Sequence, residues 1–416
     1  MYDILNGDDP IDVLTDPYNL DKSMHMLMLS SGWKASTQRL YLNRFSVYEQ
    51  VYEDFTSGKP YTMKKGHSFI LNERGKRRYI QALHPYDMLI QHTLTNSILI
   101  PLLSPYLIHD NGASIKGKGI SFTRKRFEQH LHAFYRKHGL DGYILKIDFR
   151  KYFDNIEHAK LIEILYKYIK HDRLLLIIAR ILDHYKIDVS YSDNLNILKE
   201  VFNSLEYNKI SKSLLTGDRY MCKSLGIGSP VSQILGIFFP LRLDDYCKTV
   251  KGVKYYDAYM DDRIIIHHSK SYLKNLLNEI KEVANELGLI INTKKTMIFP
   301  IHKSFTFLKT RYKLTDTGKL IKRISPDMIN RERRKLKSLS EFVISNNLDI
   351  DVFVNQYRSW RGGKDKEYKA YKQLKEIDDL YEKLLVDINK RPVVIEDIEP
   401  RWFDFNSVNM IGLAEC

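Results

Sequence analysis

Two adjacent carboxylates, Asp261 and Asp262, stand between two runs of strand-forming residues. Residues 253–256 precede them and residues 264–266 follow, which predicts two β-strands joined by a tight turn with the carboxylates at its tip. Two like charges in an apolar hairpin are costly unless a cation neutralises them. Because Mg²⁺ prefers carboxylate oxygens and substrate phosphates, the pair indicates metal-assisted phosphate chemistry. Taken alone, the same residues also suit a solvated turn.

A third carboxylate, Asp148, ends an apolar strand pattern over residues 142–148. An acid in that place is more often functional than structural when a second acidic site exists for it to meet. Asp148 and Asp261 are far apart in the sequence, so only the fold can bring them together. The helix expected from residue 157 carries a buried stripe that includes Leu161 and Leu165.

A basic hairpin is expected near the start of the chain. Residues 68–71 and 77–80 favour two strands joined by a turn. The turn and the second strand carry four cations: Arg74, Lys76, Arg77 and Arg78. A hairpin that projects cations can reach a triphosphate, and a charged, solvent-facing hairpin is the alternative.

Two glycine-containing loops could lie against a nucleic acid. Residues 111–119 carry Lys116 and Lys118 among three glycines but lack the Gly-Lys-Ser/Thr ending of a Walker loop. They suit a nucleic-acid backbone, and a plain flexible loop fits equally well. Residues 225–233 contain two glycines and a proline, so a base or sugar could approach the main chain closely there. An ordinary turn before a helix is the alternative.

Other segments are expected to frame these residues. Residues 1–66 favour a loop followed by a helix near 36–45. Further helices are expected at 231–243 and 271–287, a strand at 289–292, a hairpin at 305–308 and 311–314, and helices from 325. The last region carries a cluster of cations that could follow phosphates or simply be solvated: Arg331, Arg333, Arg334, Lys335 and Lys337.

The composition favours a polyanionic partner. The chain has 416 residues, 44% of them hydrophobic, and a net charge of +14 with a pI near 9.3. Its three scattered cysteines suggest neither a zinc site nor a disulfide framework, which fits a reducing, cytoplasmic setting. The start of the chain lacks the pattern of a signal peptide. The apolar residues 88–108 include polar residues and two prolines, so they predict buried helix and loop and no membrane partner.

The order of these features resembles the fingers and palm of reverse transcriptases over residues 68–314. Tyr259-Met260-Asp261-Asp262 is similar to the best-known sequence of that family, and residues 148–154 are similar to its first acidic motif. The resemblance implies an α+β, right-hand polymerase fold with an antiparallel-sheet palm. The implied domains are an N-terminal helical segment (1–66), fingers (67–135), palm (136–325), helical thumb (326–389) and a C-terminal tail (390–416).

The resemblance also implies roles for single residues. Asp148, Asp261 and Asp262, with the backbone carbonyl of Phe149, would bind two Mg²⁺ ions, for which Mn²⁺ could substitute. Phe153 would lie beneath the incoming sugar and exclude a 2′-hydroxyl. Other nucleotide contacts would come from Lys76, Arg78, Gly228, Ser229, Gln233, Lys294 and Lys295, with either Lys294 or Lys295 near the leaving pyrophosphate. Nucleic-acid contacts would come from Lys116, Lys118, Tyr259, Met260, Arg331, Arg334 and Lys335.

Two departures from the common family pattern bear on the subtype. Ile227-Gly228 opens the middle motif where many members have Gln-Gly, and Ser232-Gln233 closes it. This form resembles diversity-generating retroelement enzymes and some bacterial defence-associated reverse transcriptases, and it puts high copying fidelity in doubt. Residues 307–309 read Phe-Leu-Lys where the usual primer grip reads Phe-Leu-Gly, so primer handling could also differ.

The preferred function is RNA-directed DNA synthesis in anti-phage defence, with dNTPs, a dedicated template RNA, its cDNA and a non-coding RNA encoded nearby as partners. Diversification of a target gene is the nearest alternative. An RNA-dependent RNA polymerase is disfavoured by Phe153, and by Met260 where such enzymes usually have Gly. A catalytically idle RNA-binding scaffold would be expected to have lost a carboxylate, and all three are present. The sequence leaves open whether the chain forms a homo-oligomer or binds a partner protein.

Overall fold

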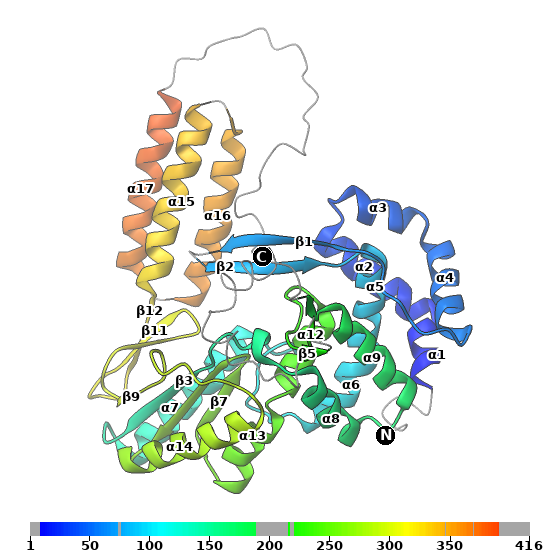
Figure 1. Ribbon diagram of the computed structural model, residues 1–416. Coiled ribbons are helices and arrows are strands. Elements are labelled where there is room, and N and C mark those ends of the chain that lie inside the picture. Colours follow the sequence, from blue (N-terminus) through cyan, green and yellow to red (C-terminus); the bar gives the residue numbers. More distant parts are fainter. Residues whose placement is uncertain are drawn as a thin grey trace. The chain divides into compact units, whose positions relative to one another are not determined.

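A computed structural model gives the fold and describes residues 9–73, 76–188, 215–216, 220–345, 347–368 and 370–390. The chain forms two compact units. The first comprises Met1–Phe134 and Gly142–Phe299, and the second comprises Tyr135–Asp141 and Pro300–Cys416. Both contain helices and antiparallel sheets, so the expected α+β class is confirmed (Figure 1).

Four helices open the first unit: α1 (Pro10–Thr15), α2 (Pro17–Ser31), α3 (Ala35–Leu42) and α4 (Arg44–Thr56). The expectation of a loop before residue 36 is therefore wrong for most of that stretch. Asp9 and Asp16 cap the first two helices by accepting hydrogen bonds from Ile11 N (2.7 Å) and Tyr18 N (2.9 Å). A proline follows each of these aspartates, where its fixed φ suits the first helical turn.

The basic hairpin is confirmed as an antiparallel ribbon of β1 (His67–Glu73) and β2 (Lys76–Ala82). A buried, mostly apolar helical stretch follows, as expected for residues 88–108, and it consists of α5 (Pro85–Thr93), the π-helical η2 (Leu94–Leu99), α6 (Ile100–Leu103) and the 3₁₀ turn η3 (Ser104–Tyr106). Among the residues described, no helix has both the length and the apolarity that a membrane span needs.

A four-stranded sheet with the strand order β7-β8-β3-β9 forms the centre of the first unit. Its strands are β3 (Tyr143–Asp148), β7 (Tyr256–Tyr259), β8 (Asp262–His267) and β9 (Met297–Pro300). Helix α14 (Lys270–Glu286) packs on β3 and β8, and α7 (Ile120–His138) contacts β7 through His130 and Asp257 (Figure 1). The apolar residues of β3 and β8 are buried, which makes this sheet a rigid support.

The remaining elements of the first unit surround this sheet. They are the 3₁₀ turn η4 (Phe153–Asn155), α8 (His158–Tyr168), α9 (Asp172–His184), α12 (Pro230–Phe238), α13 (Leu241–Asp245), the π-helical η6 (Tyr246–Val250), and a small sheet of β4 (Ile187–Asp188), β6 (Tyr220–Met221) and β5 (Leu215–Thr216). The helix expected over 231–243 is interrupted near Pro240, which has no backbone N–H to continue it. The strand expected at 289–292 is only an isolated bridge between Phe149 and Ile291.

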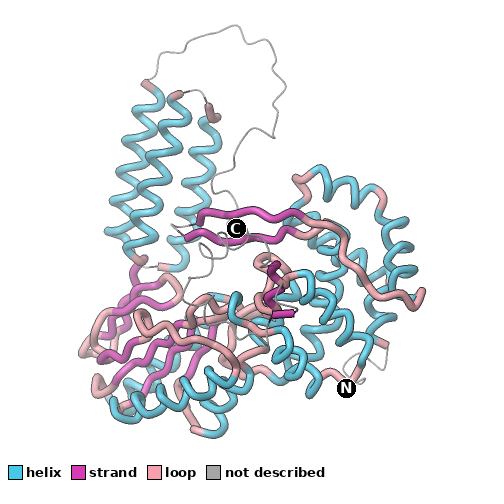
Figure 2. The backbone as a smooth tube through the Cα atoms, in the orientation of Figure 1, coloured by secondary structure: helices cyan, strands magenta, loops and turns pink. Residues whose placement is uncertain are grey.

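The second unit joins a three-stranded antiparallel sheet to three helices (Figure 2). The strands are β10 (Phe305–Phe307), β11 (Thr310–Leu314) and β12 (Leu320–Ile324), and the helices are α15 (Pro326–Ile344), α16 (Ile350–Glu367) and α17 (Tyr371–Asn389). The expected hairpin at 305–314 and the helices from 325 are confirmed.

Apart from Tyr135–Asp141, the second unit starts at Pro300, so the sheet of β10, β11 and β12 groups with the three helices. The domain limits implied by the resemblance, with the palm ending at residue 325, stay a prediction. Hydrogen bonds explain why the sheet belongs with the helices. Thr310 Oγ1 lies 2.9 Å from Tyr368 Oη, and the amide of Gln373 bonds both the N–H (3.2 Å) and the C=O (3.1 Å) of Ile324. Ile324 is also fully buried in the helical core.

Candidate active site

The Tyr259-Met260-Asp261-Asp262 sequence forms the tip of a β-hairpin, as predicted. Tyr259 ends β7 and pairs with Asp262, the first residue of β8, so Met260 and Asp261 form a two-residue turn. Met260 has a φ of +50°, a conformation that turns of this kind usually give to glycine or asparagine. The hairpin therefore presents Asp261 on a tight, conformationally demanding turn.

The sheet brings the third carboxylate to this tip. Asp148 ends β3 and pairs directly with Asp262 across the antiparallel β3–β8 ladder. Directly opposite residues of an antiparallel pair share a face, with Cβ atoms about 4.5–5.5 Å apart. Asp148, Asp261 and Asp262 are thus assembled at one end of the central sheet, although the sequence separates the first from the other two.

A fully buried arginine braces the turn from within. Arg263 follows the two aspartates, is 1% exposed, and donates a hydrogen bond to the carbonyl of Met260. Its Nε lies 3.1 Å from Asp244 Oδ1 on α13, and Tyr256 donates a further hydrogen bond to the same carboxylate. The sequence did not indicate this pair, because an isolated arginine between apolar strand residues gives no sign of its partner.

Asp148 is held by a loop that follows α14. Asn292 Nδ2 donates to Asp148 Oδ1 (2.8 Å), and Lys295 Nζ lies 3.2 Å from Asp148 Oδ2. The N–H of Asn292 bonds the Asp148 carbonyl at 2.8 Å, and Thr296 Oγ1 accepts from the Asp148 N–H at 3.3 Å. Sequence reasoning missed Asn292 and Thr296, and it assigned Lys295 to the pyrophosphate, whereas here its ammonium contacts Asp148. Lys294 is exposed beside it.

Burial and mutual repulsion shape the charges of this carboxylate group. The pKa of Asp262 is raised to about 6, chiefly by burial; Lys146 at 3.8 Å opposes this in part, and the charges of Asp261 and Asp148 add to it. Burial also raises the pKa of Asp261, and the Asp148 charge adds to this effect. A divalent cation would relieve both effects, so the three carboxylates fit a site for the divalent ions that reverse transcriptases generally use.

Two aromatic residues follow Asp148. Phe149 is buried, and its backbone forms the isolated bridge to Ile291. Phe153 is half-buried, and its backbone carbonyl accepts from Leu225 N at 3.1 Å. The Phe153 ring packs on α12 at Gly236, and its role in sugar selection stays a prediction.

The middle-motif loop begins α12. Ser229 is buried and caps the helix by accepting from Ser232 N at 3.1 Å, while its hydroxyl donates to Gln91 Oε1 at 2.6 Å. Its side chain is therefore committed to the fold, and only its backbone could meet a nucleotide. Gly228 is exposed with a φ of +95°, and Gln233 is exposed with its amide oxygen 3.4 Å from Ser114 Oγ.

The cations expected at the triphosphate lie on the β1–β2 ribbon. Lys76 and Arg78 stand two positions apart in β2, a spacing at which strand positions share a face. Arg78 also pairs with Glu73 at 2.8 Å, so a bound phosphate would compete with that carboxylate. Arg74 of the same expected cluster lies outside the described residues.

The two loop lysines differ. Lys116 is exposed, as a nucleic-acid contact requires. Lys118 instead donates to the backbone carbonyls of His109 (2.8 Å) and Asn111 (3.2 Å), so in this structure it holds the loop together. The N–H of Gly112 donates a hydrogen bond to the carbonyl of Ala258 (3.2 Å), which attaches the loop to β7 of the hairpin that carries Asp261 and Asp262.

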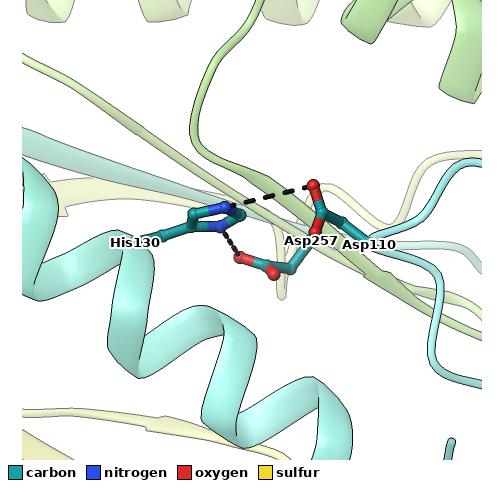
Figure 3. Close-up of side chains that lie close together, drawn as sticks. All are labelled: Asp110, His130 and Asp257. Atoms are coloured by element: carbon teal, nitrogen blue, oxygen red, sulfur yellow. Dashed lines mark hydrogen bonds and ion pairs between the residues drawn. The ribbon is translucent and has the colours of Figure 1, made fainter.

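A buried group of Asp110, His130 of α7 and Asp257 of β7 was not expected from the sequence (Figure 3). His130 Nδ1 lies 2.8 Å from Asp257 Oδ2, and His130 Nε2 lies 4.0 Å from Asp110 Oδ2. Arg126 (2.8 Å) and Lys248 (3.0 Å) already balance Asp110. Burial raises the pKa of Asp110, but hydrogen bonds from Lys248 and Arg126 outweigh it and hold the pKa at about 2. These cations make the group a charge network between α7, β7 and η6 rather than a metal site.

The cations of α15 divide into two sets. Arg333 pairs with Glu376 of α17 at 2.7 Å, so it joins two helices. Arg334 is exposed, and Arg331 and Lys335 flank Glu332, whose carboxylate is buried and accepts from Gln356 at 3.0 Å. Burial raises the pKa of Glu332, and the charges of Lys335 and Arg331 lower it in part.

Replacing Arg331, Arg334 and Lys335 together by Gln should weaken binding of RNA or RNA–DNA hybrid. Each phosphate contact adds about 0.7–0.9 to the salt slope through counterion release, so the slope of log affinity against log salt should fall by roughly two to three. A salt titration of wild type and variant measures this. A triple variant of three exposed lysines elsewhere, Lys22, Lys59 and Lys274 to Gln, removes the same charge.

Loss of Arg331 and Lys335 also removes two charges that favour the ionised Glu332. Thermal unfolding should therefore be compared before binding, and Arg334→Gln alone gives a variant that leaves Glu332 undisturbed. If the plots of log affinity against log salt had equal slopes and equal affinities for wild type and both variants, this helix face would be only solvated.

Residues 64–311 match the sequence profile of a family described as reverse transcriptase (RNA-dependent DNA polymerase). The match spans more than half of the 416-residue chain and includes all three carboxylates, so the chain belongs to the reverse transcriptase family. The family expected from the motifs is confirmed, and RNA-dependent DNA polymerisation is the activity that the description of this family names.

Among solved structures, the chain is similar to telomerase from Candida albicans, determined in complex with a TWJ fragment of telomeric RNA. The sequence identity is 11% and the TM-score is 0.45. The match covers 80% of this chain and 56% of the telomerase chain, so this chain spans little more than half of that protein's length. No curated protein matches the sequence.

Proposed function

We propose that this reverse transcriptase copies a dedicated template RNA into DNA with Mg²⁺ bound by Asp148, Asp261 and Asp262. The observation that carries the proposal is the β3–β8 register, which pairs Asp148 with Asp262 and leaves Asp261 at the adjoining turn. Bound Mg²⁺ would supply charge neutralisation for the attacking and leaving oxygens of the displacement. Mn²⁺ is the proposed substitute.

The residues of the chain prepare this chemistry in three ways. Arg263 and Asp244 hold the turn that carries Asp261. Asn292 orients Asp148, and Lys295 offsets part of its negative charge. Phosphoryl transfer asks mainly for positioning and charge stabilisation, so a preformed carboxylate group on rigid strands supplies most of what the protein must provide.

The setting proposed for this activity is anti-phage defence in the bacterial cytoplasm, with a non-coding RNA encoded nearby as template. The support is the Ile227-Gly228 and Ser232-Gln233 form of the middle motif, which resembles defence-associated and diversity-generating enzymes. Diversification of a target gene is the second candidate, supported by the same motif. A protein partner or self-association would be compatible with either role.

Two experiments test the activity and the setting. The protein is purified from cells that carry its gene together with the flanking genomic sequence, and the co-purifying RNA and DNA are sequenced. Recurrent cDNA complementary to one co-purifying RNA supports a dedicated template, and heterogeneous cDNA contradicts it. Phage challenge of cells that express wild type or Asp261→Asn tests defence, and equal plaque counts would reject that role.

Phe153→Ala should raise ribonucleotide use relative to deoxyribonucleotide use. Loss of the ring removes the wall that a 2′-hydroxyl would strike, and a pocket change of this size is worth roughly 10- to 200-fold in discrimination. The ratio of kcat/KM for a matched ribonucleotide and deoxyribonucleotide measures it. Phe45→Leu, at an exposed aromatic residue of α4, is the control, and an unchanged ratio for Phe153→Ala would remove Phe153 from sugar selection.

A further inference from the structure

The exposed face of the second unit's sheet carries two arginines directly opposite each other. Arg311 of β11 pairs with Arg323 of β12, and both are exposed. Lys313, two positions along β11, is exposed on the same face. The alternate positions of β11, Tyr312 and Leu314, are buried, so strand alternation separates an apolar face from a basic one.

These cations lack counterions in the part of the chain that the structure describes. The side chains of Arg311, Lys313 and Arg323 make neither an ion pair nor a hydrogen bond with any described residue, and only their backbones are paired in the sheet. Like charges directly opposite each other destabilise an antiparallel pair. Neither β11 nor β12 contains an acidic residue that could offset the repulsion. The arrangement is unfavourable alone and becomes favourable when an anion lies across both strands.

We propose that this basic face, formed by Arg311, Lys313 and Arg323, binds the phosphate backbone of a nucleic acid. Neighbouring strands lie about 4.8 Å apart, so one phosphate can meet guanidinium groups from both strands. The planar guanidinium fork matches phosphate in a bidentate manner, and a run of phosphates would also reach Lys313. The net charge of +14 and the family's RNA template favour nucleic acid over other polyanions. Binding here requires no catalysis and is independent of the metal site.

The test compares the full chain with Arg311→Gln/Arg323→Gln. Binding of a single-stranded RNA and of an RNA–DNA hybrid is measured over a range of salt concentrations. The double variant should bind more weakly, with a salt slope lower by about 1.4 to 1.8, because two phosphate contacts are lost. Arg311→Lys/Arg323→Lys should keep most of the slope. Lys22→Gln/Lys274→Gln, which removes two exposed cations from the first unit, should leave it unchanged.

Stability separates binding from a structural role. Because the paired arginines repel, their neutralisation should leave the melting temperature unchanged or raise it at low salt. A lower melting temperature with unchanged RNA binding would assign the pair to the fold and overturn the proposal. Unchanged RNA binding with loss of self-association would assign the face to a second copy of the chain, which also overturns it.

A second inference rests on a glycine inside α12. A Cβ at Gly236 would lie 3.1 Å from Cε1 and 3.2 Å from Cζ of Phe153, closer than a side chain normally packs. The Gly236 carbonyl accepts a hydrogen bond from the Tyr152 hydroxyl at 2.5 Å. Glycine is a poor helix former, and Gly236 does not have a positive φ, so backbone conformation does not explain it. The close approach of the Tyr152-Phe153 segment does.

We infer that Gly236 is a positioning residue: it sets how closely the Phe153 ring packs on α12, and hence the sugar selectivity. This rests on the proposed role of Phe153. The Phe153 backbone is anchored by Leu225 N at 3.1 Å, so a methyl group at position 236 would tilt the far edge of the ring away from α12. The ring would then narrow the space that it borders for the incoming sugar.

A double-mutant cycle tests this inference. Gly236→Ala should lower kcat/KM for deoxyribonucleotides several-fold without raising ribonucleotide use, and should have no further effect in the Phe153→Ala background. The melting temperature should hold or rise, because alanine favours the helix. Equal effects of Gly236→Ala in both backgrounds would overturn the inference and leave the role of Phe153 intact. Failure of Phe153→Ala to change the sugar ratio would instead reject the proposed gate itself.

Discussion

Asp148→Asn and Asp261→Asn should each lower Mg²⁺-dependent DNA synthesis on an RNA template by about 10³-fold or more. Each substitution removes a carboxylate charge from the proposed metal-binding group, and metal ions supply several kcal/mol of transition-state stabilisation, with every 1.36 kcal/mol worth tenfold in rate. Asparagine keeps the size of the side chain, so packing should be retained. Primer extension with Mg²⁺, followed under single-turnover conditions, is the measurement.

The control is Asp141→Asn, which removes one exposed carboxylate outside the site and should leave the rate unchanged. RNA binding by Asp148→Asn and Asp261→Asn should stay close to that of wild type, because the proposal assigns these carboxylates to metal ions and not to contacts with phosphates. Extension at near wild-type rate by either variant would contradict the metal assignment. Loss of RNA binding by both would point to a folding defect.

The β7–β8 hairpin could be predicted because the residues that specify it are neighbours in the sequence. Strand-forming residues on both sides of Asp261 and Asp262 specify a hairpin, and a tight turn must place those residues at its tip. Asp148 could be predicted to end a strand for the same reason. What the sequence pattern lacks is the register that pairs Asp148 with Asp262, and here the family resemblance supplied the expectation.

The supporting residues were not predictable, because their roles depend on contacts between segments far apart in the sequence. Asn292 lies in a segment whose apolar run predicted a strand, yet it forms only a bridge and turns its side chain onto Asp148. Lys118 was assigned to a ligand from loop composition and Ser229 from the family resemblance, and hydrogen bonds commit both side chains to the fold.

One error could have been avoided from local signals. The first two helices begin at Pro10 and Pro17, each directly after an aspartate that caps the helix. Asp followed by Pro is a recognisable helix start, because the carboxylate accepts an unsatisfied N–H and proline presets φ. The acidic composition of this stretch hid that signal.

Asp244→Asn should destabilise the first unit strongly, by about 3–5 kcal/mol, because it leaves the Arg263 guanidinium buried without a counter-charge. Arg263 is 1% exposed and lies 3.1 Å from Asp244. The same guanidinium bonds the carbonyl of Met260, so the loss should also disturb the turn that carries Asp261. Denaturant unfolding measures the stability, and primer extension below the unfolding transition measures the remaining activity.

A neighbouring ion pair provides the matched control. Arg242 lies on the same short helix as Asp244 and pairs with Glu286 at 2.6 Å, but both side chains are more than half exposed. Glu286→Gln should therefore change the stability by only about 0–1 kcal/mol and leave activity unchanged. If Asp244→Asn were as mild as Glu286→Gln, the buried pair would not brace the hairpin. If it lowered stability but folded protein kept full activity, the brace would serve the core and not the position of Asp261.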